Sequence, residues 1–487
     1  MNKKIEPVVL KEKNTIKEAM KCIDRGGLRV AFIINKEEKL LGVITDGNIR
    51  RALLEGKDFN CPIKNVMTTD LISVKKETSA TKILEIMIKN NIQEIPIINN
   101  KGVLIDIILL RDLKSIPLSS PDITHREIKI ISQVLNSSYL SIGPKVKEFE
   151  KKIANYIGVQ YAIAVNSGTS ALHLCIRALD LKDGDEVITT PFSFIASANC
   201  MLFERAKPVF VDIDENTLCI DSQKIEGKIT KRTKAILPVH IFGHPCEMQK
   251  IMAIAKKYNL AVIEDACEAL GSEYKNKKVG SFGDVATFAF YPNKQITTAE
   301  GGMIVTNNKN IAKLCFSMRN QGRDEGNAWL SHSRLGYNYR MSELSAALGV
   351  IQMERIKEIL RKRKKVAKLY NQKLSNIKEI KTPHIGSDIK MSWFVYIIRL
   401  NDQKFSRKDR DKIIEKLNNK GISCRDYFPP IHLEPFYVGM FSHKRGDFPI
   451  TEKVSSTTIA LPFYNNLTEE EVDYVCGNLK NILAEIF

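Results

Sequence analysis

The chain has 487 residues, of which 44% are hydrophobic and 27% are charged. This composition excludes a disordered chain, and the length is enough for about three domains of ordinary size. Lysine and arginine outnumber aspartate and glutamate by 74 to 56, which gives a net charge of +18. The sequence nevertheless has no zinc-finger spacing, aromatic RNA-binding signature or basic-leucine heptads. We therefore expect no nucleic-acid partner and assign most of the charge to solvated lysines.

The ten cysteines are scattered, and no two of them form a Cys-x-x-Cys pair, so we expect buried, reduced thiols. His240, His244 and Cys246 lie close together in the sequence. Because Pro245 interrupts any helix that could align them, we predict no metal site there. Residues 1–14 lack the apolar core of a signal peptide, and no stretch is apolar enough to span a membrane. The sequence predicts a cytoplasmic protein.

Residues 1–116 contain an internal repeat with an offset of 64 residues. The segment Ile33-Ile34-Asn35 in the first copy matches Ile97-Ile98-Asn99 in the second. Each copy predicts a helix, two short apolar strands and the start of a further helix. Two half-domains of this kind would bury their apolar sheet faces against each other.

This repeat resembles a tandem pair of CBS domains over nearly all of residues 5–115. In that family a Thr or Ser and an Asp three residues later, after the last strand, hold the ribose of an adenosine-type nucleotide. The first copy has Thr45 and Asn48 at these positions, and the second has Leu109 and Asp112. Neither copy has the full pair: Asn48 can still hydrogen-bond a ribose hydroxyl, but Leu109 cannot. Two alternatives stay open: an adenosine nucleotide bound by Thr45, Asn48 and Asp112, and a purely structural or dimerising module.

A proline-containing segment, residues 115–122, predicts a linker to one long α/β body. Six apolar strands separated by helix-length segments are expected at residues 161–165, 186–190, 208–212, 235–239, 260–264 and 285–290. This alternation predicts a mainly parallel sheet with helices on both faces. A helix is predicted from about Met341 to Leu374, with the basic run 361–365 on its solvated face. No G-x-G-x-x-G follows a strand, which disfavours a dinucleotide-binding domain.

Functional residues of open α/β sheets lie just past the carboxyl ends of the strands. The first strand runs into residues 166–170 (NSGTS), which open a helix and suit either a phosphate or an ordinary N-cap. Asp265 and Lys294 follow two later strands. A pyridoxal phosphate (PLP) site needs this pair, since the lysine forms a Schiff base and the aspartate keeps the pyridine nitrogen protonated. From spacing alone, a surface lysine beside a capping aspartate is the simpler interpretation.

The amino-acid sequences around Asp265 and Lys294 decide between a PLP site and a surface lysine beside a capping aspartate. In chain order they are VNSGTSALHL, VIEDACEALGS, VGSFGDVATFAFYPNKQITTAEGGMIVTN and LGYNYRMSELSAALG. Together with PPIHLEPFY and LPFYNNLTEEEVDYV, they closely resemble the DegT/DnrJ/EryC1/StrS family of nucleotide-sugar aminotransferases, from about Pro121 to the C-terminus. The resemblance implies a fold-type-I PLP-dependent transferase of the α/β class. It would comprise a PLP-binding large domain at residues 117–370 and a smaller C-terminal α/β domain at residues 371–487, after the CBS pair at residues 1–116.

The resemblance also implies the residues that hold the cofactor. Lys294 would be the Schiff-base lysine and proton shuttle, and Asp265 would be the partner of the pyridinium nitrogen. Gly168 and Thr169 would hold the phosphate, while Phe194 would stack on the ring.

Further residues are implied at the subunit boundary and at the substrate. Asn338 and Arg340, from GYNYR, resemble residues that reach into the partner subunit's site, which implies an obligate homodimer. Tyr427 and His432 lie where the family often contacts the sugar nucleotide.

Two positions depart from the pattern of many family members. Ala289 stands where a serine hydroxyl often bonds the phosphate, so one hydrogen bond is missing or another group supplies it. Glu268 stands where a glutamine often lies near the cofactor's ring oxygen. Because a carboxylate beside a phenolate is repelled, we expect a shifted Glu268 pKa or a compensating cation.

The sequence therefore predicts a PLP-dependent aminotransferase that aminates a keto group of a nucleotide-linked 4-keto-6-deoxy sugar, with glutamate as the donor, for surface-polysaccharide or amino-sugar biosynthesis. One alternative is a sugar dehydratase of the same fold, although in one branch of those enzymes a histidine replaces the lysine. The other is a non-catalytic nucleotide sensor, which the intact Asp265 and Lys294 pair disfavours.

Overall fold

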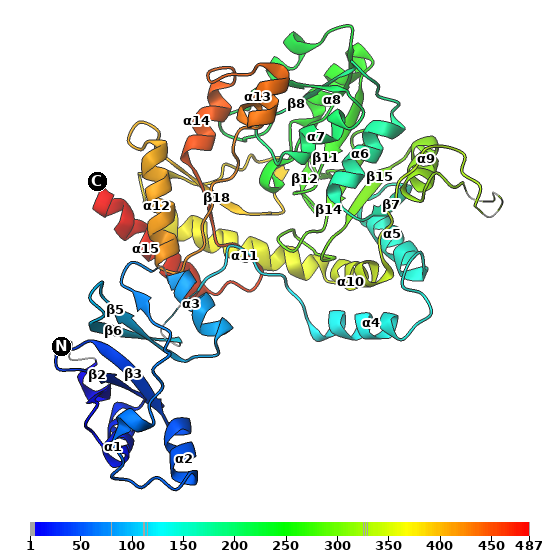
Figure 1. The fold of residues 1–487 in the computed structure, drawn as a ribbon. Helices are drawn as coiled ribbons and strands as arrows, with labels where there is room; N and C mark the ends of the chain where they lie inside the picture. Colours follow the sequence, from blue (N-terminus) through cyan, green and yellow to red (C-terminus); the bar gives the residue numbers. More distant parts are fainter. Residues whose placement is uncertain are drawn as a thin grey trace. The chain divides into compact units, whose positions relative to one another are not determined.

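The computed structural model describes residues 5–78, 80–110, 113, 115–324, 326, 328 and 330–486. The chain divides into two compact units (Figure 1). Unit 1 comprises Met1–Ile116 and Glu415–Ile422, and unit 2 comprises Pro117–Ile414 and Ser423–Phe487. None of the helices in the described part of the chain is long and apolar enough to cross a membrane.

Unit 1 contains two copies of one small motif, as the repeat predicted. The elements of the first copy are β1 (Val9–Lys11), α1 (Ile16–Gly26), β2 (Val30–Ile34), β3 (Leu40–Thr45) and α2 (Asp46–Leu54). Those of the second are β4 (Val74–Lys75), α3 (Ala80–Lys89), β5 (Glu94–Ile98) and β6 (Leu104–Leu109). Each copy forms a three-stranded sheet in which the first strand is parallel and the third antiparallel to the second. The short first strand of each sheet was not predicted, and the helix expected after β6 lies outside the described residues.

The two copies bury apolar side chains against each other. Phe32 and Ile34 of β2 share one cluster with Leu104 and Ile107 of β6. The helix α1 begins at a capping box, in which Thr15 and Glu18 exchange side-chain and backbone hydrogen bonds. The expectation that the half-domains cover each other's sheet faces is thus confirmed.

A seven-stranded sheet forms the centre of unit 2. In spatial order its strands are β7 (Tyr161–Val165), β15 (Gly302–Thr306), β14 (Val285–Ala289), β11 (Ala261–Asp265), β10 (Thr233–Ile236), β8 (Glu186–Thr189) and β9 (Lys207–Phe210). All strand pairs are parallel except the two that β15 makes with its neighbours. The mainly parallel sheet is confirmed, but the antiparallel strand β15 was missed. It follows β14 without an intervening helix, so the strand–helix alternation left no place for it.

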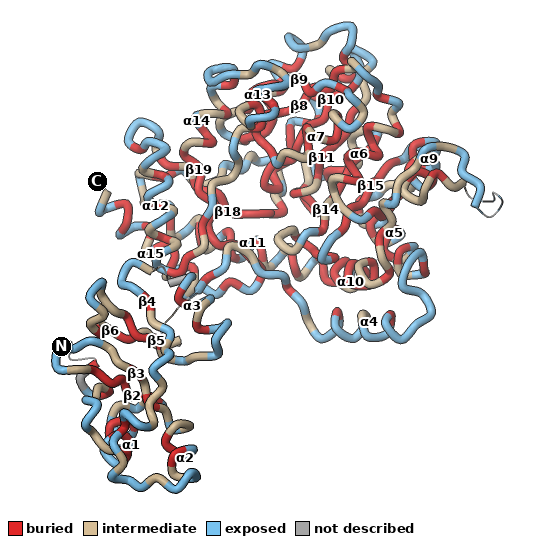
Figure 2. Tube along the Cα trace, in the orientation of Figure 1, coloured by how far each residue is buried: buried red, intermediate tan, exposed pale blue. Residues whose placement is uncertain are grey.

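Helices cover both faces of this sheet (Figure 1). They are α4 (His125–Leu135), α5 (Pro144–Ile157), α6 (Gly168–Ala178), α7 (Ala196–Leu202), α8 (Met248–Tyr258), α9 (Lys309–Arg319), α10 (Glu343–Glu354) and α11 (Ile356–Leu374). Side chains of β7 alternate between two clusters: Ile163 and Val165 pack with α6 and α9, whereas Ala162 and Ala164 pack with α5 and α10. The strands are accordingly buried on both faces, as Figure 2 shows.

The C-terminal part of unit 2 has a small antiparallel sheet with helices beside it. Its strands are β16 (Ile380–Lys381), β18 (Tyr396–Leu400) and β19 (Thr458–Leu461). The nearby helices in sequence are α12 (Arg407–Asn419), α13 (Pro435–Phe441), α14 (Pro449–Thr457) and α15 (Glu469–Ile486). A second small sheet joins β12 (Glu273–Tyr274), β13 (Lys277–Lys278) and β17 (Ile389–Lys390). Short 3-10 helices lie at Glu6–Val8, Ile63–Asn65, Ser222–Lys224, Glu226–Lys228, Ile241–Gly243 (η6) and Ile431–Leu433 (η7).

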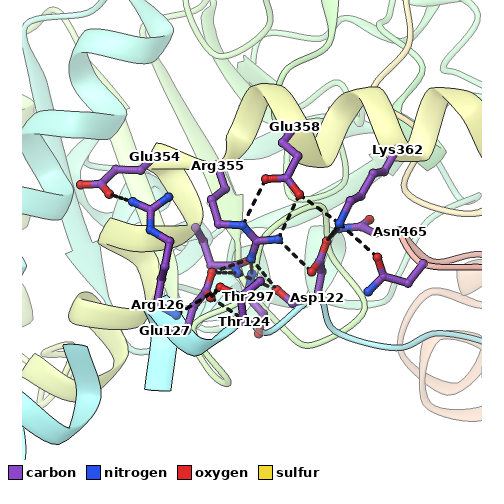
Figure 3. A network of polar contacts seen from close by, with 12 residues as sticks. Asp122, Thr124, Arg126, Glu127, Thr297, Glu354, Arg355, Glu358, Lys362 and Asn465 are labelled. Atoms are coloured by element: carbon purple, nitrogen blue, oxygen red, sulfur yellow. Dashed lines mark hydrogen bonds and ion pairs between the residues drawn. The ribbon is translucent and has the colours of Figure 1, made fainter. Parts of the chain in front are cut away.

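The single helix predicted from Met341 to Leu374 is wrong, because the structure has two helices that meet at Arg355. Arg355 is buried, and its guanidinium bonds the carboxylates of Asp122 and Glu127 (Figure 3). These partners come from the segment that precedes α4 and from α4 itself. A distant contact of this kind breaks the helix, and the helix-favouring residues around Arg355 give no local sign of it.

Candidate active site

The carboxyl ends of three strands and one helix start lie at the same edge of the central sheet. Asp265 is the last residue of β11, and Lys294 follows β14, the neighbouring strand. Across β15, the helix α6 begins at Gly168 directly after β7. Because β15 is antiparallel, its first residue, Gly302, pairs with both Val165 and Ala289 at this edge. The sheet order therefore gathers residues that the sequence separates by more than a hundred positions.

Asp265 is buried, and both of its carboxylate oxygens accept hydrogen bonds. The hydroxyl of Ser197 donates to Oδ2 over 2.7 Å, and the backbone N–H of Cys267 donates to Oδ1 over 3.1 Å. Ser197 is in turn 2.8 Å from the hydroxyl oxygen of Ser193. These bonds fix the orientation of the carboxylate, and the sequence analysis did not identify Ser197.

The amino group of Lys294 lies between a carboxylate and an aromatic ring. Its Nζ is 3.5 Å from Oε1 of Glu268 and 3.9 Å from the ring centroid of Phe394. The Lys294 side chain is largely enclosed, with 13% of its surface exposed. Phe394 also escaped the sequence analysis, since a lone phenylalanine in an apolar segment gives no functional signal.

Glu268 shows both of the features expected for a carboxylate at this position. Burial raises its pKa above the ordinary value, while the charge of Lys294 and a backbone hydrogen bond from Phe242 oppose that rise. The Phe242 N–H donates to Oε2 over 2.8 Å. The shifted pKa and the compensating cation therefore occur together.

The first turn of α6 lies against the end of β14. Ser167 caps the helix, with its Oγ accepting a hydrogen bond from the Ser170 N–H over 3.1 Å. A Cβ on Gly168 would meet the Ala289 Cβ at 2.7 Å and the Cys267 Sγ at 3.2 Å. Only glycine fits there, and the first N–H groups of the helix have no intrahelical acceptor, which suits an anion such as a phosphate. Thr169 follows in the same turn. Ala289 has a methyl group at the position where many family members have a serine hydroxyl.

Phe194 lies in the loop between β8 and α7, and its side chain is 58% exposed. It directly follows Ser193, the residue linked through Ser197 to Asp265. The stacking of Phe194 on the cofactor ring stays a prediction.

The segment that carries Asn338 and Arg340 lies beside the end of β7. The carbonyl of Tyr339 accepts a hydrogen bond from the N–H of Asn166, and Arg340 pairs with Val165. The guanidinium of Arg340 donates to the Asn320 side chain over 3.1 Å, while Asn338 is exposed.

Tyr427 and His432 have different surroundings. Burial and the charge of Glu268 raise the pKa of Tyr427. His432 is fully buried, its Nε2 is 3.2 Å from Glu452 Oε1, and its ring packs on Phe448. Its Nδ1 is buried and has no hydrogen-bond partner among the described residues, and the substrate contact expected at His432 stays a prediction.

In unit 1 the side chains of Thr45 and Asn48 bond each other at the start of α2. The Thr45 hydroxyl donates to Asn48 Oδ1 over 2.6 Å, and the Asn48 Nδ2 donates to Thr68 Oγ1 over 3.2 Å. Leu109 ends β6, and Asp112 lies outside the described residues.

The cluster of His240, His244 and Cys246 is held by protein groups. His240 Nε2 is 3.1 Å from Glu264 Oε2, and its Nδ1 accepts a hydrogen bond from the Cys246 N–H over 3.0 Å. The Nδ1 of His244 is 2.8 Å from the carbonyl oxygen of Pro245. Within the described ranges, no group of three or more His, Cys, Asp or Glu residues is arranged to hold a metal ion.

Comparison with known proteins identifies both parts of the chain. Residues 121–480 match the model of the DegT/DnrJ/EryC1/StrS aminotransferase family, and residues 1–55 and 63–118 match the CBS domain. An uncharacterized protein of Methanocaldococcus jannaschii is 42% identical over 76% of this chain and 98% of its own length. The GDP-perosamine synthase of Caulobacter vibrioides is 39% identical over 77% of this chain and its full length.

Solved structures give the same result. The aminotransferase PseC of Helicobacter pylori, involved in the biosynthesis of pseudoaminic acid, is 31% identical, covers 76% of this chain and all of its own, and has a TM-score of 0.72. A putative sugar aminotransferase of Streptococcus pneumoniae, solved in PLP and PMP forms, has a TM-score of 0.73 over 77% of this chain and all of its own. The chain belongs to the DegT/DnrJ/EryC1/StrS aminotransferase family and is a PLP-dependent sugar aminotransferase preceded by two CBS domains.

Proposed function

We propose that this enzyme transfers the amino group of L-glutamate to a keto group of a nucleotide-linked 4-keto-6-deoxy sugar, in the synthesis of amino sugars or surface polysaccharides. The observation that carries the proposal is the enclosed Lys294 amino group beside the strand that ends in the Ser197-bonded Asp265. Relatives named GDP-perosamine synthase in three bacteria support a nucleotide sugar as substrate. A relative named as a spore coat polysaccharide biosynthesis protein supports the pathway.

The residues at the sheet edge fit PLP. The close approach of Gly168 to Ala289 leaves room only for a glycine at the helix start that would receive the phosphate. The buried Oδ1 of Asn293, the residue before Lys294, has no hydrogen-bond partner among the described residues. Bound there, PLP supplies an electron-withdrawing ring that stabilises negative charge on the carbon that bears the transferred nitrogen.

The protein's own groups then have separate tasks. Asp265, oriented by Ser197, holds a proton at the pyridine nitrogen. Lys294 Nζ takes a proton from the donor's α-carbon in the first half of the reaction and gives a proton to the acceptor carbon in the second half. Gly168 and Thr169 bind the phosphate through backbone N–H groups, and the exposed ring of Phe194 covers the cofactor ring. Tyr427 would contact the substrate near Glu268.

The visible spectrum tests this assignment. Purified enzyme should show the absorption of PLP bound to a lysine, glutamate should bleach it, and Lys294→Ala should abolish both bleaching and turnover. A panel of UDP-, GDP- and dTDP-linked 4-keto-6-deoxy sugars then identifies the acceptor by the glutamate-dependent appearance of an amino sugar. Loss of water without amination would instead favour the dehydratase, and a protein that ignores PLP would overturn the enzyme assignment.

A homodimer with shared active sites is part of the proposal. Exposed apolar side chains lie on α4, in the loop that follows it and in the loop that precedes Asn338: Ile128, Leu135, Tyr139, Leu140, Ile142, Leu330 and Leu335. A second copy of the chain is the occupant that we propose for this surface. When inactive Lys294→Ala and Arg340→Ala subunits are refolded together, hybrid dimers with one intact site should restore about a quarter of the activity. No recovery on mixing would contradict shared sites.

For unit 1 we propose an adenosine-type nucleotide at Thr45 and Asn48. Their mutual hydrogen bonds show that the two side chains lie close enough to grip one ribose. Calorimetric titration of the full-length enzyme with AMP, ATP and S-adenosylmethionine tests the site, with Asn48→Ala as the control variant. Absence of heat from all three would favour a structural module.

The domain limits and the compartment complete the proposal. The separation of compact units after Ile116 supports a CBS pair at residues 1–116. The large domain at residues 117–370 and the small domain at residues 371–487 would share helix α11, which spans their boundary. The ten cysteines are all free thiols, which supports action in the reducing cytoplasm.

A further inference from the structure

Glu268 distinguishes this enzyme's lysine pocket from that of family members with glutamine at this position. The Lys294 Nζ lies 3.5 Å from one carboxylate oxygen and 3.9 Å from the centre of the Phe394 ring. Only 7% of the Glu268 side-chain surface and 13% of the Lys294 surface are exposed. A cation in this position is attracted by the carboxylate and by the negative face of the ring, with little screening by water.

The carboxylate of Glu268 is held so that one oxygen remains for Lys294. The N–H of Phe242 donates to Oε2 over 2.8 Å, which leaves Oε1 facing the lysine. The backbone carbonyl of Glu268 accepts a hydrogen bond from the side chain of Gln295, the residue that follows Lys294. The turn with the carboxylate and the loop with the lysine are therefore fixed to each other at two points.

The backbone of Phe242 and the side chain of Gln295 also hold the segment that carries the Phe394 ring. The N–H of Phe394 donates to the carbonyl of Phe242 over 3.1 Å, so Phe242 bonds both walls of the pocket. Phe242 has φ 55°, a conformation that costs a bulky residue energy and persists only where its surroundings enforce it. The side chain of Gln295 also donates to Ser392, two residues before Phe394. Glu268, Lys294 and Phe394 are thus held together by one set of connected hydrogen bonds.

Two other ionisable groups near Glu268 and Lys294 do not take the place of Glu268 as the partner of the lysine. Asp265 acts on Glu268 through its charge, but its carboxylate is turned toward Ser197 and the Cys267 N–H. Tyr427 is neutral at ordinary pH, because burial and the Glu268 charge raise its pKa. Glu268 is consequently the carboxylate in direct contact with the lysine.

We propose that Glu268 is a positioning residue that holds the Lys294 ammonium against Phe394 whenever this amino group is not bonded to the cofactor. The inference rests on the assignment of Lys294 proposed above. This contact keeps the long, flexible Lys294 side chain at the site during the half of the catalytic cycle in which the lysine is released from the cofactor.

The reactivity of Lys294 in the cofactor-free enzyme tests this directly. After removal of PLP, brief acetic anhydride pulses across a pH series modify free amines, and mass spectrometry of the Lys294 peptide gives the rate at each pH. In Glu268→Gln, which keeps the shape and the hydrogen bond from Phe242, Lys294 should be acetylated about 10-fold faster or more, because its amino group is no longer held by the carboxylate. Phe394→Leu, which keeps the carboxylate, should accelerate the reaction by a smaller factor.

Glu273→Gln is the matched control, because Glu273 pairs with the exposed Lys390 at 2.9 Å on the same unit. It should leave the Lys294 profile unchanged. Superimposable profiles for wild type and Glu268→Gln would overturn the inference. If that variant fails to fold, an unchanged rate of acetylation in Phe394→Leu has the same consequence.

A second measurement separates this inference from the proposed function. Borohydride reduction of the PLP-loaded enzyme followed by peptide mass spectrometry locates the lysine that carries the cofactor. Attachment at another lysine would refute the assignment of Lys294 itself. Attachment at Lys294 with superimposable profiles would refute only the role of Glu268.

Discussion

The Ser197 hydroxyl donates to Oδ2 of Asp265 over 2.7 Å, and both side chains are buried. Ser197 comes from α7, whereas Asp265 ends β11, so the contact exists only because the sheet order brings the two elements together. A hydroxyl that donates to a buried carboxylate stabilises its ionised form, which is the form that can hold a proton on a pyridine nitrogen.

Replacing Ser197 by Ala should therefore weaken the enzyme without unfolding it. A hydrogen bond to a charged group contributes about 1.5–3 kcal/mol, so we expect PLP affinity or kcat to fall by about 10- to 100-fold. PLP titration followed by absorbance and steady-state kinetics measure the two effects. Ser193→Ala, which leaves the bond to Asp265 in place, is the control. Equal losses in both variants would contradict a specific action on Asp265.

Gly168→Ala should damage the cofactor site through simple crowding. The new Cβ would lie 2.7 Å from the Ala289 Cβ, so the start of α6 or the end of β14 must move. Overpacking of this kind costs about 1–3 kcal/mol of folding free energy, and displacement of the first helical N–H groups should lower PLP affinity further. Urea unfolding and PLP titration check both parts. Gly227→Ala, where no atom lies within 4 Å of the new Cβ, should change neither quantity.

Substitutions in the buried network of Figure 3 should lower the free energy of unfolding of unit 2 more than substitutions at exposed ion pairs. Arg355 bonds Asp122 and Glu127, and all three side chains are at most 3% exposed. Arg355→Met leaves Glu127 buried without its cation and Asp122 with Lys362 as its remaining cation, which should lower the free energy of unfolding by about 3–5 kcal/mol. Lys250→Ala, which removes an exposed pair with Glu247, should cost less than about 1 kcal/mol. Denaturant unfolding curves of both variants test the contrast, and similar losses would refute it.

Acid should remove part of the stability that this network provides. Burial opposes ionisation of Asp122, but hydrogen bonds from Arg355, Lys362 and Asn465 prevail and lower its pKa to about 2. Because the folded pKa lies below that of the unfolded chain, the contribution is complete above about pH 4 and is lost as the pH falls toward 2. The difference in unfolding free energy between wild type and Asp122→Asn should shrink over this interval. A difference that stays constant from pH 6 to pH 2 would contradict the assignment.

Glu264 is a buried carboxylate on which the neighbouring loop depends. It accepts backbone hydrogen bonds from Gly280, Phe282 and Gly283 at 2.7–2.8 Å and contacts His240. Although burial opposes ionisation, these groups keep its pKa below the ordinary value. Glu264→Gln replaces one acceptor oxygen by a donor that faces backbone N–H groups. We expect a thermal midpoint several degrees lower, with Glu273→Gln as the control, measured by differential scanning calorimetry.

Local sequence order determined most of the overall organisation. The repeat predicted two similar half-domains, and the alternation of apolar strands with helices predicted a mainly parallel sheet, because burial on one or both faces imposes a regular spacing on apolar residues. The same pattern missed β15 and merged α10 with α11. An antiparallel insertion has no helix before it, and the break at Arg355 results from carboxylates more than 200 positions away.

The sequence by itself determined the family, and it supplied the expected pairing of Asp265 with Lys294 and the carboxylate at residue 268. Only the tertiary structure decided what surrounds them. Ser197, Phe242 and Phe394 reach the site from three separate segments, and His432 is buried beside Glu452 and Phe448. The physical reason is that such contacts depend on strand order and side-chain packing, which bring distant residues within hydrogen-bond distance and leave no mark on their immediate neighbours in the chain.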